Sequence, residues 1–320
     1  MDKILIIGSA GQIGSELTLK LREMYGGDNI IAGVRETSIS GPLAETGPFD
    51  EIDVTDGKGL ARTVKKYDID VIINLAAILS ATGERSPLLA WDVNMNGLIN
   101  VLEVARELKL KQVLVPSSIA VFGPTTPRNN TPQETVLKPA TIYGITKVAG
   151  ELLGDFYVKK YGMDVRGLRY PGIISHETLP GGGTTDYAVA IYYEAVKNNR
   201  YTCFVKEETR LPMMYMPDCL KSTIDLMHAD FSRLRNHCDF NIGAMSFSAG
   251  ELAASVKKHM PEFEISYEPD YRQEIADSWP NSIDDTAARE QWNWQPDYDL
   301  DAMTRDMLRA IREKQKKELI

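Results

Sequence analysis

Cysteine is scarce in this sequence. Its 320 residues include only Cys203, Cys219 and Cys238, and no two of them have the C-x-x-C spacing. An odd number of cysteines without that spacing argues against a disulfide framework. The four histidines show no spacing typical of a metal site. We therefore expect free, buried thiols in a reducing cytoplasm and no structural metal.

Long apolar runs and an excess of positive charge are also missing. No apolar stretch approaches the about 20 residues of a membrane span, and residues 1–3 lead directly into a predicted strand, which leaves no room for a secretory signal. With 36 Lys and Arg against 45 Asp and Glu, the net charge is −9. This charge disfavours nucleic acid or an anionic membrane as the main partner. We expect a globular protein with a small-molecule substrate.

A glycine-rich turn follows the first predicted strand. The apolar run at 3–7 leads into Gly8-Ser9-Ala10-Gly11-Gln12-Ile13-Gly14, and a helical pattern begins at Gln12. Glycine allows a tight turn and a close approach of the backbone to a ligand. The amides and dipole of a helix start suit a pyrophosphate. In this position G-x-x-G-x-x-G predicts a dinucleotide site.

Strand and helix patterns alternate through the first half of the chain. The predicted strands are 3–7, 29–33, 49–53, 71–75, 112–116 and 164–169, and the predicted helices are 12–25, 56–67, 87–109 and 144–161. This rhythm predicts an α/β fold with a doubly wound parallel (Rossmann) sheet.

The rhythm changes after residue 169. We predict a helix at 185–198, a strand near 214–216, a helix at 217–229, a strand at 238–242, a helix at 249–259, a strand at 264–267 and a helix at 299–317. We assign 1–171 to a dinucleotide-binding domain and 172–320 mainly to a smaller α/β substrate lobe, some of whose segments return to the sheet.

Tyr143 and Lys147 are spaced as neighbours on one face of a predicted helix. An ammonium beside a phenol favours the phenolate and lowers the pKa of the phenol, which is normally about 10. Such a phenolate can take the proton of an alcohol near neutral pH. Ser118, about 25 residues upstream, is placed to hold the same alcohol. The three side chains predict oxidation of a carbinol.

Together these motifs resemble the extended short-chain dehydrogenase/reductase superfamily. Within it, the closest resemblance is to the short-chain L-threonine 3-dehydrogenases. The segments that carry it are Pro116–Pro124, Arg169–Gly172, Gly181–Ala188 and Ser278–Pro280. The resemblance implies that Tyr143 is the acid/base, that Lys147 binds the nicotinamide ribose and lowers the Tyr pKa, and that Ser118, rather than Ser117, orients the substrate oxygen.

The resemblance and the predicted sheet edge also give candidate binding residues. For the cofactor they are Gly8, Gly11, Gln12, Ile13, Gly14, Arg35, Asp53, Val54, Leu75, Ala76, Ala77, Asn94, Ser117, Tyr143, Lys147, Tyr170 and Pro171. For the substrate they are Ser80, Ser118, Tyr143, Gly183, Thr184, Thr185 and Trp279, with Trp279 as a lid and 181–183 as its hinge.

The implied reaction is NAD-dependent oxidation of L-threonine to 2-amino-3-oxobutanoate, in threonine catabolism. Three alternatives stay open: NADP as the cofactor, a nucleotide-sugar enzyme of the same superfamily, and a non-catalytic dinucleotide-sensing regulator on this fold. At the end of the second predicted strand, Gly33-Val34-Arg35-Glu36, the acid expected to bind the NAD ribose is missing from its usual position. Arg35 could suit a 2′-phosphate, which leaves NADP open. A nucleotide-sugar epimerase or dehydratase of the same superfamily would use the same Tyr and Lys. The resemblance further implies a cytoplasmic homodimer built on helices 87–109 and 144–161.

Overall fold

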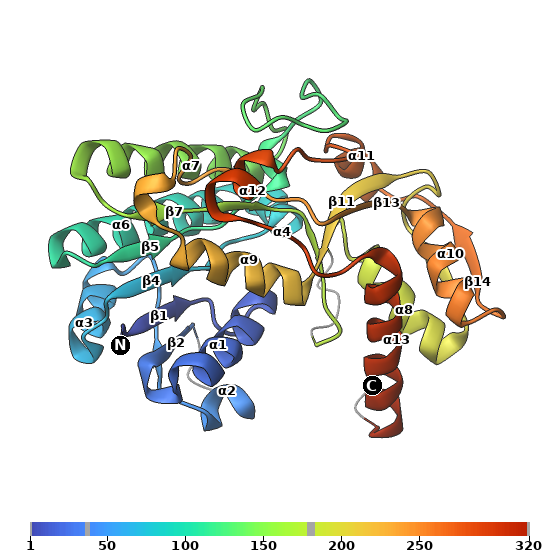
Figure 1. Cartoon of the computed structure of the whole chain (residues 1–320), viewed down its shortest axis with the longest axis horizontal. Helices are drawn as coiled ribbons and strands as arrows, with labels where there is room; N and C mark the ends of the chain where they lie inside the picture. The colour runs from blue at the N-terminus through green and yellow to red at the C-terminus, as the bar shows by residue number, and fades with distance from the viewer. Residues whose placement is uncertain (1, 36–38, 178–182, 319–320) are drawn as a thin grey trace. The chain divides into compact units, whose positions relative to one another are not determined.

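The computed structural model describes residues 2–35, 39–177 and 183–318. It divides into two compact units (Figure 1). The first comprises Met1–Val121, Thr141–Arg169 and Leu220–Phe240, and the second comprises Phe122–Ala140, Tyr170–Cys219 and Asn241–Ile320.

This division differs in two places from a single boundary at residue 171. Residues 122–140 belong to the second unit because their backbone pairs with a later segment, with a hydrogen bond of 2.9 Å from Thr131 N to the Ser282 carbonyl. Residues 220–240 return to the first unit, where Met227 packs in the core beneath the sheet. The return of such a segment was predicted, but its bounds were not.

The first unit is built on a six-stranded sheet in the order β3-β2-β1-β4-β5-β7, in which neighbouring strands are parallel. Its strands are β1 (Ile4–Ile7), β2 (Ile30–Val34), β3 (Phe49–Glu51), β4 (Val71–Asn74), β5 (Gln112–Leu114) and β7 (Val165–Arg166). A smaller ladder has the order β12-β8-β6, from Phe240–Asn241, Leu168–Tyr170 and Ser117–Ser118. The predicted doubly wound α/β fold is confirmed.

Alternating side chains of β1 supply both faces of this sheet. Ile4 and Ile6 pack with Leu17 and Leu21 of one helix, whereas Leu5 and Ile7 pack in a larger cluster on the opposite face. Successive side chains of a strand point to opposite faces, so a strand buried on both sides is apolar throughout. This explains the unbroken apolar run at the start of the chain.

Helices cover both faces of the first unit's sheet (Figure 1). On one side lie α3 (Gly57–Tyr67), α6 (Gly97–Leu108) and α7 (Ile142–Tyr161), and on the other lie α1 (Gln12–Tyr25) and the end of α9 (Met216–His228). Short helices join them: α2 (Pro42–Glu45), α4 (Ser80–Arg85), α5 (Pro87–Trp91) and a π-helical turn η2 (Asp92–Asn96). This unit also contains the 3₁₀ turns η1 (Gly27–Asn29) and η3 (Ile119–Val121).

The second unit contains two small sheets and its own helical core. One sheet has the order β13-β11-β9, from Met245–Ser248, Arg210–Tyr215 and Gly172–Ile174, and the other pairs β10 (Arg200–Cys203) with β14 (Glu264–Tyr267). The helix α8 (Tyr187–Asn198) packs with α10 (Ala249–His259) and α13 (Leu300–Lys316). Two short helices, α11 (Arg272–Asp277) and α12 (Thr286–Trp292), and the turn η4 (Phe231–Arg233) of the first unit complete the chain.

Candidate active site

The glycine-rich turn has the geometry of a backbone cradle. Gly8 has φ +86°, a conformation that residues with a side chain rarely adopt. A Cβ at Gly14 would lie 2.2 Å from the Gly8 carbonyl oxygen, so only glycine fits there. The N-cap of α1 is Gly11, which offers no side chain to the amides of the first turn. Those amides are left for a ligand, which is the arrangement that binds a pyrophosphate.

The loop after β4 lies against this turn. A Cβ at Gly8 would come within 3.0 Å of the Ala76 amide nitrogen and 3.1 Å of the Leu75 carbonyl carbon. Leu75, Ala76 and Ala77 are half-buried. The carboxyl ends of two neighbouring strands therefore meet where a doubly wound sheet binds its ligand.

Asn94 fastens the same loop to the helix that carries the Tyr/Lys pair. Its amide nitrogen donates to the Ile78 carbonyl at 3.0 Å and to the Thr146 hydroxyl at 3.1 Å, while its oxygen accepts from the Ile78 amide at 2.8 Å. It belongs to η2, and π-helical turns occur frequently at functional sites. Asn94 thus has a bracing role in the structure, and its contact with a cofactor stays a prediction.

Asp53, which follows the third strand, has its hydrogen-bond partner within its own turn. Asp53 accepts hydrogen bonds from the Thr55 hydroxyl at 2.7 Å and amide at 2.9 Å, and these bonds hold its pKa below the usual range, helped by Arg35. Arg35 and Asp53 are exposed, whereas Val54 is buried in the core cluster. Asp53 and Arg35 are accessible to a ligand, and Val54 offers only its backbone.

Tyr143, Lys147 and Ser118 are close together. The Lys147 Nζ lies 5.6 Å from the centre of the Tyr143 ring, and Ser118 is hydrogen-bonded to Tyr143. The Lys147 ammonium donates to the Pro116 carbonyl at 2.7 Å. Thr141 begins α7 by accepting from the Gly144 amide at 3.1 Å, which fixes the turn that carries Tyr143.

The predicted lowering of the Tyr143 pKa is wrong for the protein alone. Burial raises the pKa of the Tyr143 phenol to about 12, although the hydrogen bond from Ser118 opposes the shift. Burial lowers the pKa of Lys147 to about 8, against the negative charge of Glu151. Spacing placed the two side chains on one face, but the ammonium is directed to the Pro116 carbonyl, and desolvation dominates the pKa of the phenol.

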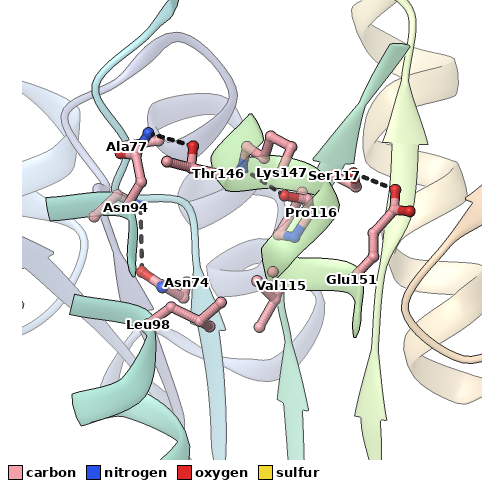
Figure 2. Close-up of a pocket in the computed structure, with 12 residues that line it drawn as sticks. Asn74, Ala77, Asn94, Leu98, Val115, Pro116, Ser117, Thr146, Lys147 and Glu151 are labelled. Atoms are coloured by element: carbon pink, nitrogen blue, oxygen red, sulfur yellow. Dashed lines mark hydrogen bonds between the residues drawn. The ribbon is translucent and has the colours of Figure 1, made fainter. Parts of the chain in front are cut away.

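A narrow pocket opens beside these residues, and Figure 2 shows its lining. Five of the predicted cofactor residues line it, namely Ala76, Ala77, Asn94, Ser117 and Lys147. The other lining residues were not predicted: Asn74, Leu98, Val115, Pro116, Thr146, Gly150 and Glu151. Thr146, Gly150 and Glu151 lie three, seven and eight residues after Tyr143, on the same side of the helix. That helical spacing was the signal available for finding them.

The substrate residues predicted from the resemblance fall in both units. Ser80 is the buried first residue of α4 in the first unit. Gly183, Thr184, Thr185 and Trp279 belong to the second unit, as do Tyr170 and Pro171 of the cofactor set. Thr184 and Trp279 are buried, and the Gly183 amide donates to the Asp186 carboxylate at 2.7 Å. The other two hinge glycines, Gly181 and Gly182, lie outside the described residues.

Residues 2–35, 39–177 and 183–318 contain neither a membrane-spanning helix nor a cluster of metal ligands. None of the helices in these ranges is long and apolar enough to cross a membrane. These ranges also contain no group of three or more His, Cys, Asp or Glu residues able to hold a metal ion. Cys203, Cys219 and Cys238 are buried and form no disulfide.

The sequence model of the NAD dependent epimerase/dehydratase family matches residues 4–243. The chain belongs to this family. Membership confirms NAD as its cofactor and agrees with the glycine cradle at the start of α1. A curated relative, an uncharacterized epimerase/dehydratase of Staphylococcus haemolyticus, is 49% identical over 98% of this chain and 99% of its own.

Solved structures of similar family members are L-threonine dehydrogenases. That of Clostridium difficile is 55% identical, with 98% of each chain covered and a TM-score of 0.96. A monomeric L-threonine 3-dehydrogenase from a metagenome is 48% identical, covering 97% of this chain and 99% of its own, with a TM-score of 0.92. The predicted resemblance and the prediction of an enzyme are confirmed.

The lowered pKa of Lys147 predicts unusual reactivity. Because a neutral amine is the nucleophile, Lys147 should react with acetic anhydride with a midpoint near pH 8. Peptide mass spectrometry of trace-labelled protein across neutral to alkaline pH measures this midpoint. Lys111, whose pKa is raised by ion pairs with Asp2 and Asp70, is the control and should react only at higher pH. A Lys147 midpoint at or above that of Lys111 would contradict the burial argument.

Proposed function

We propose that this enzyme oxidises the C3 hydroxyl of L-threonine to a ketone, giving 2-amino-3-oxobutanoate, with NAD as hydride acceptor. The observation that carries the proposal is the similarity to solved L-threonine dehydrogenases over nearly the whole chain. The arrangement of Ser118, Tyr143 and Lys147 supports the same chemistry.

In this proposal Tyr143 takes the proton of the C3 hydroxyl as the C3 hydride leaves. Ser118, already hydrogen-bonded to Tyr143, holds the substrate oxygen as it becomes a carbonyl. Lys147 is mostly protonated at neutral pH, since its pKa is about 8, and it supplies positive charge beside the developing phenolate. Acid–base catalysis of this kind contributes roughly 10²–10⁴ in rate.

The cofactor residues of the first unit fit NAD. The turn Gly8–Gly14 would hold the pyrophosphate, Arg35 and Asp53 are accessible near the ribose end, and Lys147 would hold the nicotinamide ribose. Bound NAD supplies the hydride acceptor, and its positively charged ring favours an ionised Tyr143. The phenol needs this second cation because burial holds its pKa near 12 in the protein alone.

We propose that Ser80, Gly183, Thr184, Thr185 and Trp279 recognise the substrate. An amino acid needs donors for its carboxylate and acceptors for its ammonium, and a threonine hydroxyl can serve as either. Trp279, as a lid, would exclude water from the reacting carbinol.

We also propose a cytoplasmic homodimer. The buried, unbridged cysteines fit a reducing compartment. Leu88, Trp91 and Ile99 expose 86%, 44% and 40% of their surface on the helices from 87 to 108, and Leu152 and Phe156 expose 66% and 48% on α7. Exposed apolar side chains concentrated on two adjoining helices favour an interface.

The first test of the proposed function is a substrate panel. We expect NADH absorbance to rise with L-threonine and NAD, much less with L-serine, and not at all with UDP-galactose. NADP should be a poorer acceptor. Tyr143→Phe should keep NAD affinity and lose about 10²–10⁴-fold in kcat, because it lacks the proton acceptor.

The panel also gives the outcomes that oppose the proposal. Tightly bound NAD in the purified protein, with stabilisation by UDP-galactose and no response to L-threonine, would favour a nucleotide-sugar epimerase. Near-normal turnover by Tyr143→Phe would remove this residue as the base.

A second prediction concerns the substrate hydroxyls. Thr184→Ala should raise the KM for L-threonine by about tenfold to a hundredfold, the value of one hydrogen bond to a charged group. Steady-state kinetics and calorimetric NAD binding measure the two effects separately. Thr184→Ser keeps the hydroxyl and should stay near wild type. A change confined to NAD affinity would overturn the assignment.

A third prediction concerns the oligomer. Wild-type protein should sediment as a dimer, and Leu152→Glu or Phe156→Glu should shift it to monomer because a charge would be buried at the interface. Met24→Glu places the same charge at a residue that is 44% exposed on α1, and should leave the dimer intact. The similar metagenome enzyme is described as monomeric. A wild-type protein that stays monomeric at all concentrations would contradict this prediction.

A further inference from the structure

A buried ion pair lies one helical turn beyond Lys147. Glu151 of α7 and Arg169 of β8 have side chains only 5% and 2% exposed. The Arg169 Nε donates to Glu151 Oε1 at 2.9 Å and its Nη2 donates to Oε2 at 2.8 Å, a bidentate pair. Asp239 lies 3.7 Å from the same guanidinium. The mechanism described above uses none of these three residues.

The pair is connected to the candidate active site through Ser117. The Ser117 hydroxyl donates to Glu151 Oε1 at 2.5 Å, as Figure 2 shows. The residue before it, Pro116, accepts from Lys147, and the residue after it, Ser118, bonds Tyr143. Three consecutive residues thus contact three successive turns of α7, at Tyr143, Lys147 and Glu151. Of these three contacts, the one at Glu151 is also held by a second buried side chain, that of Arg169.

Glu151 also acts on Lys147 through its charge. It is the ionised group whose field opposes the effect of burial on the Lys147 pKa. Among the described residues, the titratable or charged groups of this cluster are Tyr143 and Glu151 on α7, Arg169 on β8, and Asp239, which lies 3.7 Å from Arg169. The other polar neighbours across the pocket, Asn74 and Asn94, are neutral.

We propose that Glu151 and Arg169 are positioning residues of this active site: the pair fixes residues 116–118 against α7 and keeps the Lys147 ammonium charged. A buried carboxylate is costly unless it is paired and fully hydrogen-bonded. Burial raises the pKa of Glu151, and the hydrogen bonds from Arg169 and Ser117 oppose that rise. They favour a carboxylate charge one turn from the ammonium that has to stay protonated during turnover. The catalytic use of that ammonium rests on the function proposed above.

Glu151→Gln tests the charge, because glutamine keeps the size and an acceptor for Ser117. The Lys147 acetylation midpoint should fall by about one pH unit, the usual effect of one nearby opposite charge. The kcat for L-threonine should fall at least about tenfold at neutral pH, with NAD affinity nearly unchanged. Glu103→Gln is the matched control: it neutralises a carboxylate of α6 that pairs with Arg106, outside this cluster, and should leave the midpoint unchanged.

A double variant keeps the inference testable if Glu151→Gln does not fold. Breaking a buried pair is strongly destabilising, whereas replacing both members by apolar residues of similar volume is often tolerated. Glu151→Leu combined with Arg169→Met should therefore fold, and its Lys147 midpoint should also fall. Circular dichroism and thermal unfolding confirm the fold of each variant before labelling.

The outcomes separate this inference from the proposed function. A folded Glu151→Gln or double variant with a wild-type Lys147 midpoint would overturn the inference and reduce the pair to a structural contact, whatever the activity. If wild type fails to oxidise L-threonine while the midpoint still shifts, the proposed function fails and the action of Glu151 on Lys147 stands.

Discussion

The segment of residues 116–118 has to stay at a fixed distance from α7 for any chemistry at this site. Ser118 comes from the chain that leaves β5, whereas Tyr143 and Lys147 come from a helix about 25 residues further on. The chain between Ser118 and Tyr143 is too long to fix the distance between the two side chains by itself. The bonds from Lys147 to the Pro116 carbonyl, from Ser117 to Glu151 and from Ser118 to Tyr143 set it instead. The glycine cradle and the β4 loop are useful only if this contact holds.

Burial of the contact changes the charges that it carries. Desolvation disfavours the charged form of each group, and so it raises the pKa of Tyr143 to about 12 and lowers that of Lys147 to about 8. Burial therefore destabilises both the phenolate form of Tyr143 and the ammonium form of Lys147. The opposite charge of Glu151 supports the ammonium from inside the protein. In the proposed function, the ring of bound NAD would supply the cation that supports the phenolate, so that cofactor and ion pair would act together.

The sequence could predict whatever depends on local spacing. The first helix begins and ends at Gln12 and Tyr25 as expected, because glycine placement and helical period are local signals. The strand at Gly172–Ile174 was missed because its run is short and follows a proline. Spacing correctly put Tyr143 and Lys147 on one face. It could not show that the ammonium turns to the Pro116 carbonyl, or that Glu151 finds Arg169, since both depend on distant backbone.

The candidate residues for catalysis and most of those for substrate choice belong to different units of the chain. Ser118, Tyr143, Lys147 and the glycine cradle all belong to the first unit, and the acid–base chemistry proposed for them would serve any secondary alcohol. Substrate choice then depends on groups that recognise the rest of the molecule, and most of the candidates for that role belong to the second unit. A family motif confined to the first unit cannot identify the substrate. Similarity to L-threonine dehydrogenases carries weight because it extends over 98% of the chain and so includes both units.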